Sequence, residues 1–171
     1  MKKTLTLLFA SATIITACNQ NKKEDATYPG PVKPATEAAP TTQEDARYAI
    51  VDLTAGDDMK FNTKEIRVKA GQTVKLSLTH TGTMKSNVMG HNFVLLDTTV
   101  SFEGFVEESN KAQDNGYLSK SMEKDIIAHT KLLGGGERDE IEFAAPKKGT
   151  YDFLCSFPGH AAIMRGKFIV E

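Results

Sequence analysis

The feature that most constrains the fold of this chain is a strict alternation of apolar and polar side chains. It is clearest over residues 73–80 and recurs over 66–69 and 140–143. A period of two is typical of strands that bury one face. The same reasoning predicts further strands at 48–54, 91–97, 150–155 and 167–170. We therefore expect an all-β domain, built as a sandwich of two antiparallel sheets over a single core.

One stretch, residues 98–125, interrupts this rhythm. Phe102, Phe105 and Val106 fall at helical spacing and follow Ser101, a residue type that caps helix N-termini. The pattern predicts a short helical flap that is inserted between strands and packs on the outside of the sandwich. No internal repeat or second domain is apparent in the sequence.

The N-terminus has the pattern of a targeting segment. Two lysines precede a short apolar run that ends in Ile15-Thr-Ala-Cys18. The run is too short and too interrupted for a stable membrane span. Its end resembles the cleavage box of bacterial lipoproteins, which implies that residues 1–17 are removed and that Cys18 is acylated. The alternative is an ordinary signal peptide that is cut near Ala17, with Cys18 incidental.

Residues 18–44 have the composition of a disordered tether. Four of the six prolines lie here among Lys, Glu, Thr and Ala, and large apolar side chains are nearly absent. Such a segment cannot bury enough surface to offset the entropy of ordering it. We expect residues 45–171 to form the globular domain, held at the periplasmic or envelope side of a bacterial membrane by lipid on Cys18.

Residues 155–164 place a thiol, an imidazole and a thioether on one short loop, as Cys155, His160 and Met164. Pro158 and Gly159 favour a tight turn that brings His160 back beside the sulfur. A second imidazole is available at His91. One Cys, two His and a distant Met form the donor set of a blue-copper electron-transfer centre.

Each of these residues also has an ordinary structural explanation. A free cysteine on an inward strand face, such as Cys155, is often a buried structural thiol. Met164 by itself would be core filler, and a lone histidine at a strand end, such as His91, is more often structural than a ligand. The metal hypothesis depends on their occurring together.

Two motifs resemble the copper loops of azurins, which are bacterial blue-copper cupredoxins. They are Met89-Gly-His-Asn92 and Cys155-Ser-Phe-Pro-Gly-His160, the latter followed by Met164. Residues 58–63, 87–90 and 127–136 are also similar. The resemblance covers nearly all of residues 45–171.

The resemblance implies an eight-stranded Greek-key sandwich and one type 1 copper ion. Its equatorial ligands would be His91, Cys155 and His160, with Met164 as a long axial ligand and the Gly90 carbonyl as a weaker axial contact. Backbone N–H groups of Asn92 and Phe157 would donate to the sulfur, and the Asn92 side chain would tie the two copper loops together.

The resemblance also implies an apolar docking patch around the exposed edge of His160. Redox partners such as c-type cytochromes or reductases would bind it weakly and leave quickly. Core packing is the alternative role for its methionines. Besides Phe157, which borders His160, the implied patch residues are Met59, Met84, Val88, Met89, Pro158, Ala162 and Ile163.

The chain departs from the azurin pattern in two respects. Azurins carry a disulfide near the start of the domain, whereas the only cysteines here are Cys18 and Cys155. The missing cross-link is worth about 2–4 kcal/mol, so we expect lower stability without metal. Phe93 stands where azurins often have a buried Trp.

The leading functional prediction is an electron carrier that turns over no substrate and acts as a monomer. A copper-binding lipoprotein for sequestration or delivery would use the same ligands and stays open. An enzyme is disfavoured, because a thiol protease needs an exposed Cys155 with an oriented base and a multicopper enzyme needs more than the four histidines present. The net charge of -1 without a basic cluster argues against nucleic acid.

Overall fold

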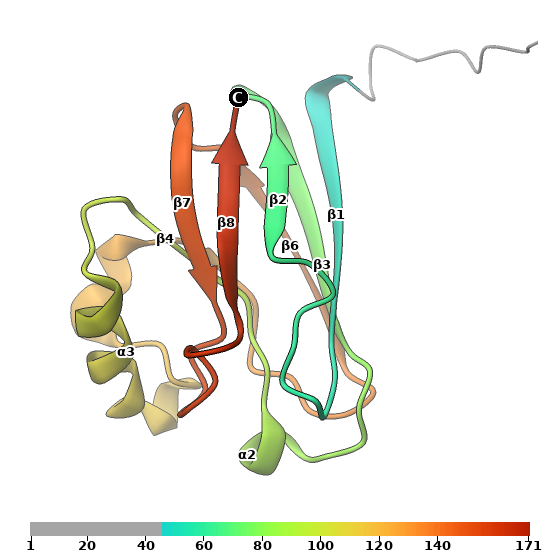
Figure 1. Ribbon diagram of the computed structural model, residues 1–171, viewed down its shortest axis with the longest axis vertical. Coiled ribbons are helices and arrows are strands. Elements are labelled where there is room, and N and C mark those ends of the chain that lie inside the picture. Colours follow the sequence, from blue (N-terminus) through green and yellow to red (C-terminus); the bar gives the residue numbers. More distant parts are fainter. Residues whose placement is uncertain (1–45) are drawn as a thin grey trace, which may run out of the picture. The chain divides into compact units, whose positions relative to one another are not determined.

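The computed structural model describes residues 46–171, so the predicted signal peptide, Cys18 and the tether lie outside the described residues. Within this range the chain forms a two-sheet β-sandwich (Figure 1). No helix in the described part of the chain is both long and apolar enough to cross a bilayer. The strands are β1 (Tyr48–Ala55), β2 (Glu65–Val68), β3 (Thr73–His80), β4 (Val94–Leu96), β5 (Ile126–His129), β6 (Arg138–Ala144), β7 (Gly149–Leu154) and β8 (Arg165–Val170).

The two sheets are mixed, which corrects the prediction of antiparallel sheets. One sheet has the order β1-β3-β6 and the other β2-β8-β7-β4-β5. The pairs β1–β3 and β2–β8 are parallel, whereas β3–β6, β7–β8, β4–β7 and β4–β5 are antiparallel. The chain crosses to the second sheet as β2 before it returns as β3 beside β1. Alternation of apolar and polar side chains shows which face of a strand is buried. It does not show whether the neighbouring strand runs parallel or antiparallel.

The core between the sheets is filled by the apolar faces that the alternation predicted. Leu53, Leu76, Leu78, Phe153 and Phe168 are each at most 1% exposed and belong to one cluster. Cys155 and Met164 belong to the same cluster and are fully buried. The two sulfur-bearing residues are therefore part of the core at one end of the sandwich.

The flap lies on the outer face of the five-stranded sheet, as predicted. It begins with α3 (Phe102–Asn110), whose N-cap Ser101 accepts a hydrogen bond from the Gly104 N–H at 3.2 Å. Two 3₁₀ turns follow, η1 (Gln113–Asn115) and η2 (Lys120–Asp125). Phe105 packs with Val94, Leu96 and Leu154 in a second buried cluster. Because β4 is buried on both faces, its sequence is a continuous apolar run rather than an alternation.

Strand β5, which ends at His129, was missed. Strand β4 is also shorter than predicted, because residues 91–93 precede it and His91 makes only an isolated bridge to Leu133. A single-turn helix, α2 (Ser86–Met89), lies just before this segment. The short β4 and the helix α2 occur where the backbone leaves the sheet to form the end described below.

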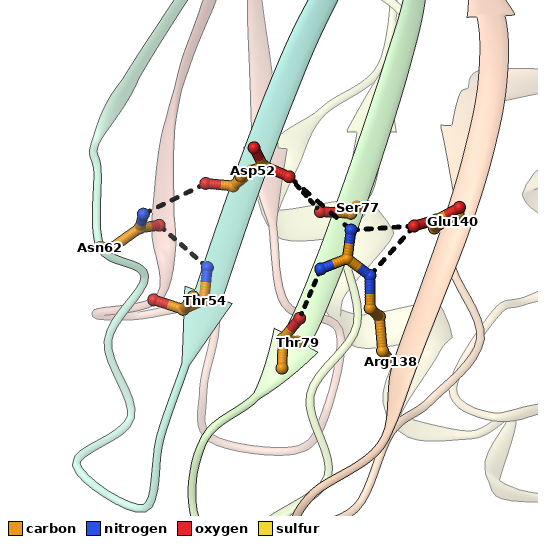
Figure 2. Close-up of polar contacts among 7 residues, drawn as sticks. All are labelled: Asp52, Thr54, Asn62, Ser77, Thr79, Arg138 and Glu140. Carbon is orange, nitrogen blue, oxygen red and sulfur yellow. Dashed lines mark hydrogen bonds and ion pairs between the residues drawn. The ribbon is translucent and has the colours of Figure 1, made fainter.

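The outer face of the three-stranded sheet carries a polar network (Figure 2). Arg138 donates to Glu140 Oε1 through Nε at 3.0 Å and Nη2 at 2.8 Å, and Ser77 donates to Asp52 at 2.7 Å. At the edge of β1, the Asn62 amide accepts from the Thr54 N–H and donates to the Asp52 carbonyl (Figure 2). The Asn62 side chain thus provides hydrogen-bond partners for backbone groups of β1 that an edge strand would otherwise leave unpaired.

Three connections converge at the end of the sandwich opposite the C-terminus (Figure 1). They are the β1–β2 loop, the segment from β3 through α2 to β4, and the β7–β8 loop. They carry Met59, His91 and His160, respectively. All of the predicted site residues within the described range lie on these loops or at their bases.

Candidate metal centre

The loop between β7 and β8 is closed at its base by a backbone hydrogen bond. The N–H of Cys155 donates to the Met164 carbonyl at 2.9 Å, and the N–H of Met164 donates to the His160 carbonyl at 2.8 Å. Gly159 has φ +82°, a conformation that favours glycine. The turn predicted from Pro158 and Gly159 thus returns His160 to the sulfur, with 3.6 Å between its Nδ1 and Cys155 Sγ.

His91 reaches the same sulfur from the other loop. Its Nδ1 lies 4.0 Å from Cys155 Sγ, and its Nε2 lies 2.8 Å from the Gly56 carbonyl. A carbonyl can only accept, so Nε2 carries the proton and Nδ1 presents a lone pair towards the sulfur. This is the arrangement that a metal-ligating imidazole requires, with its second nitrogen bonded to an orienting acceptor.

His91, Cys155 and His160 form the one group of three or more His, Cys, Asp or Glu side chains in residues 46–171 that could hold a metal. Their donor atoms lie within 4.8 Å of one another. All three residues are buried, with exposures of 0%, 0% and 3%. Water has little access to the space between these donors.

Gly90 brings a carbonyl to the centre. Its oxygen lies 3.7 Å from Cys155 Sγ. A Cβ at this position would clash with the Ser86 carbonyl and with the Leu132 side chain. Only glycine fits here, because α2 and the β5–β6 loop, which carries Leu132, both approach this position closely. Met164 ends the β7–β8 loop and is fully buried in the same core cluster as Cys155.

Buried hydrogen bonds connect the two loops that carry the donors. Asn92 Oδ1 accepts from the Ser156 N–H at 2.8 Å, and Asn92 Nδ2 donates to Ser156 Oγ at 2.8 Å. The backbone N–H groups of Asn92 and Phe157 bond to the Cys155 sulfur and act to lower its pKa. Phe157 also packs on the His160 ring, with 4.6 Å between ring centroids.

Burial dominates the protonation of the metal-free centre. Desolvation raises the pKa of the Cys155 thiol to about 11, although the two backbone hydrogen bonds oppose this shift. Desolvation, followed by repulsion from His91 and His80, lowers the pKa of His160 to about 4. The pKa of His91 is also lowered, again chiefly by desolvation. At neutral pH the metal-free site therefore holds a thiol and two neutral imidazoles.

The donor chemistry fits copper. Two imidazoles and one thiol with a thioether nearby form a soft set that suits copper, whereas zinc prefers further thiolates, imidazoles or carboxylates. No carboxylate belongs to the group. Both imidazoles are already neutral, so only the thiol must lose a proton on binding.

The remaining histidines stay outside the group. His80 is fully buried and stacks on His91 with 4.5 Å between ring centroids. Its Nε2 donates to the Met89 carbonyl and its Nδ1 accepts from the Gly82 N–H, so neither nitrogen is available to a metal. His129 is exposed at the end of β5.

The predicted docking residues surround the loops but differ in exposure. Met84, Val88 and Ile163 are 43%, 59% and 48% exposed, and Pro158 and Ala162 are exposed as well. Met59 and Met89 are half-buried, and Met59 packs against the core cluster. The geometry brings a largely apolar surface to the mouth of the site.

Two contributors were not anticipated from the sequence. Gly56 orients His91, and Ser156 completes the bonds to Asn92. Ser156 could have been found, since it adjoins Cys155. Gly56 lies 35 residues from His91 and acts through its backbone carbonyl, so no side-chain signal marks it.

Residues 49–171 match the family described as copper binding proteins, plastocyanin/azurin family. This chain belongs to that family. Its fold is the cupredoxin fold, and its cofactor is copper. The azurin of Pseudomonas chlororaphis is 40% identical over 126 residues, which cover 71% of this chain and 97% of that protein.

Two further relatives extend the comparison. The outer membrane protein H.8 of Neisseria gonorrhoeae is 36% identical over 189 residues, with 98% of this chain and 97% of that protein covered. The solved structure of an azurin, Az-iso2, from Methylomonas sp. strain J is 32% identical, with a TM-score of 0.65 over 71% of this chain and 97% of that one. Both relatives therefore match the azurin-like part of this chain, and the match to H.8 extends over its N-terminal part as well.

Proposed function

We propose that this chain carries electrons through one copper ion held by His91, Cys155 and His160, with Met164 and the Gly90 carbonyl as weaker axial contacts. The observation that carries the proposal is the burial of two imidazole nitrogens and one thiol within 4.8 Å of one another in a copper-binding family. Copper supplies one-electron cycling between its cuprous and cupric states. The proposal assigns the chain no substrate turnover.

The surrounding bonds support a carrier because they hold the donors in place. The Asn92–Ser156 bonds join the two loops, and the Cys155–Met164 backbone bond closes one of them. Donors that move little between oxidation states keep the barrier to electron transfer low.

We further propose that electrons leave through His160 into partners bound at the apolar patch. The patch residues are Met59, Met84, Val88, Met89, Pro158, Ala162 and Ile163, with Phe157 packed on the His160 ring. A small apolar contact of this kind suits a weak, short-lived complex with a c-type cytochrome or a reductase. We expect the carrier to act as a monomer.

Attachment to the bacterial envelope is part of the same proposal. Residues 1–17 would be a signal peptide, Cys18 would carry lipid, and residues 18–44 would tether the domain that spans 45–171. Support comes from a relative that matches 98% of this chain and is named an outer membrane protein. More than one acyl chain on a single residue would give stable anchoring. Whether the anchor lies in the inner or the outer membrane is tested by fractionation.

The deciding experiment is the visible and EPR spectrum of the copper-loaded protein. We expect an intense blue cupric form that Cys155→Ser abolishes, because the thiolate is the donor that gives this class its colour. Ser121→Ala, an exposed change on the flap, should leave the spectrum intact. Retention of the colour in Cys155→Ser would show that the ligand assignment is wrong.

Copper sequestration or delivery is the second candidate, because H.8 is named for its location and not for electron transport. The two functions predict opposite rankings for the rate of electron transfer and the rate of metal exchange. A carrier is reduced and reoxidised by a cytochrome faster than a chelator removes its metal. Metal exchange that outpaces electron transfer would favour the delivery role.

A further inference from the structure

A groove of about 760 Å³ lies beside the apolar patch. It is bounded by the start of α3, the β1–β2 loop and the start of β8. Ala162 and Ile163 line it and also belong to the patch, so the two surfaces are continuous. Its charged lining residues are Lys60, Lys64, Glu103, Asp152, Arg165 and Lys167.

Positive charge in the groove exceeds negative charge. Lys167 Nζ lies 2.6 Å from Asp152 Oδ1, and that pair is neutral. The Arg165 guanidinium stacks over the Phe102 ring at 5.0 Å, which leaves its charge uncompensated. Within residues 46–171, Lys60 and Lys64 form no ion pair, and both are exposed. Glu103 is the one acidic lining residue that is not paired with a cation among these residues, so a net positive charge remains.

The walls that carry these charges are fixed by the fold. The N–H of Lys167 donates to the Lys64 carbonyl at 2.9 Å, which joins the β1–β2 loop to β8. The stacking of Arg165 on Phe102 joins β8 to the flap. The excess of cations is local, because the whole chain has a formal charge of only -1.

We propose that this groove receives a carboxylate-rich surface segment of the protein that exchanges electrons at the apolar patch. The inference rests on the proposed electron-transfer function and adds the chemistry of the partner. The patch provides apolar contact next to His160, whereas the groove attracts the acidic side of the partner and so fixes its orientation. Charges at the rim of such an interface act mainly on the association rate.

Two other occupants fit the groove less well. A bilayer surface is flat and does not fill a concavity. The chain's own tether offers no more than two neighbouring carboxylates, Glu24 and Asp25, and these directly follow Lys22 and Lys23. A partner loop with several neighbouring carboxylates is complementary to the positive charge of the groove.

The test is an NMR titration of the ¹⁵N-labelled full chain with a hexaglutamate peptide. At an ionic strength of about 10 mM, where the screening length is about 30 Å, we expect amide shifts centred on residues 60–66 and 165–167. Lys60→Gln/Lys64→Gln should weaken binding about fivefold or more. Lys147→Gln/Lys148→Gln is the matched control, because it removes the same charge from exposed lysines at the turn between β6 and β7.

Equal binding by the two double variants, shifts spread over both ends of the domain, or no binding at all would overturn the proposal. So would binding to phosphatidylglycerol vesicles, but not to the peptide, that is lost in Lys60→Gln/Lys64→Gln. The titration involves no electron transfer. Failure of the blue spectrum would therefore remove the proposed function, whereas failure of the titration would remove only the assignment of the groove.

Discussion

At the scale of single residues, the tautomers of the buried histidines decide which of them can bind metal. His91 and His80 each donate from Nε2 to a backbone carbonyl, of Gly56 and Met89 respectively. The difference lies at Nδ1, which in His80 accepts the Gly82 N–H and in His91 faces Cys155. The two stacked imidazoles therefore differ in what they can bind. The Gly82 N–H occupies Nδ1 of His80, whereas Nδ1 of His91 faces the Cys155 sulfur.

The same protonation states predict the proton balance of copper binding. At pH 7 the Cys155 thiol is protonated, since its pKa is raised to about 11, and His160 is neutral, since its pKa is lowered to about 4. Binding should therefore release about one proton per copper, from the sulfur. Towards pH 4 the release should rise towards two, because His160 is then partly protonated before binding.

Indicator-dye measurements of proton release at pH 7 and pH 4 check this prediction. Cys155→Ser should abolish the release at pH 7 if it still takes up copper. A release of two protons at neutral pH would mean that a histidine is charged in the metal-free protein, contrary to the burial described above.

Asn92 gives a second prediction at this scale. Asn92→Ala would leave the buried Ser156 N–H without its acceptor and remove the bonds between the copper loops. An unsatisfied buried group costs about 1–3 kcal/mol, so we expect a loss of that size in the free energy of unfolding. Denaturant unfolding of the metal-free protein measures it. Ser156→Ala keeps the N–H bond and should cost less, and an equal loss in both variants would contradict this account.

At the scale of elements, the flap shows what a pattern can and cannot predict. Ser101 followed by apolar residues at helical spacing correctly indicated α3, because capping and amphipathic spacing are local. Strand β5 was not predicted, because its residues 126–129 are all apolar or His and show no alternation. The parallel β1–β3 and β2–β8 pairs were missed because pairing depends on which sheet the chain enters next, and no residue records that.

The N-cap of α3 can be tested separately from the copper site. Ser101→Ala removes the acceptor for the Gly104 N–H, so we expect a loss of about 1 kcal/mol in the free energy of unfolding and faster amide exchange in α3. Ser101→Asp retains a side-chain acceptor and should behave like the parent. The blue spectrum should be the same in all three proteins. A changed spectrum in Ser101→Ala would show that the flap and the copper loops are coupled.

At the scale of the whole molecule, the candidate site was more predictable than the sheets that carry it. Cys155, His160 and Met164 lie within ten residues, so their spacing and the Pro158-Gly159 turn already placed them together. His91 was found only because a donor set was incomplete without it. The contacts that orient His91 come from Gly56, at the start of the β1–β2 loop, and from His80, at the end of β3. Such contacts depend on the assembled sandwich, not on local sequence.

The metal should therefore stabilise the whole domain, since its donors come from separate loops that only the folded chain brings together. This domain has one cysteine in its described residues, Cys155, which is free and buried, so no disulfide supplements the core there. A ligand that binds only the folded state adds about 2.7 kcal/mol to the free energy of unfolding when its free concentration is 100 times its dissociation constant.

Copper should therefore raise the thermal midpoint, and the rise should be larger at higher copper concentration. Scanning calorimetry of the metal-free and loaded protein measures this rise, with Cys155→Ser as the comparison that should lose most of it. A midpoint that is unchanged by copper in the parent protein would mean that the donors do not act as one site.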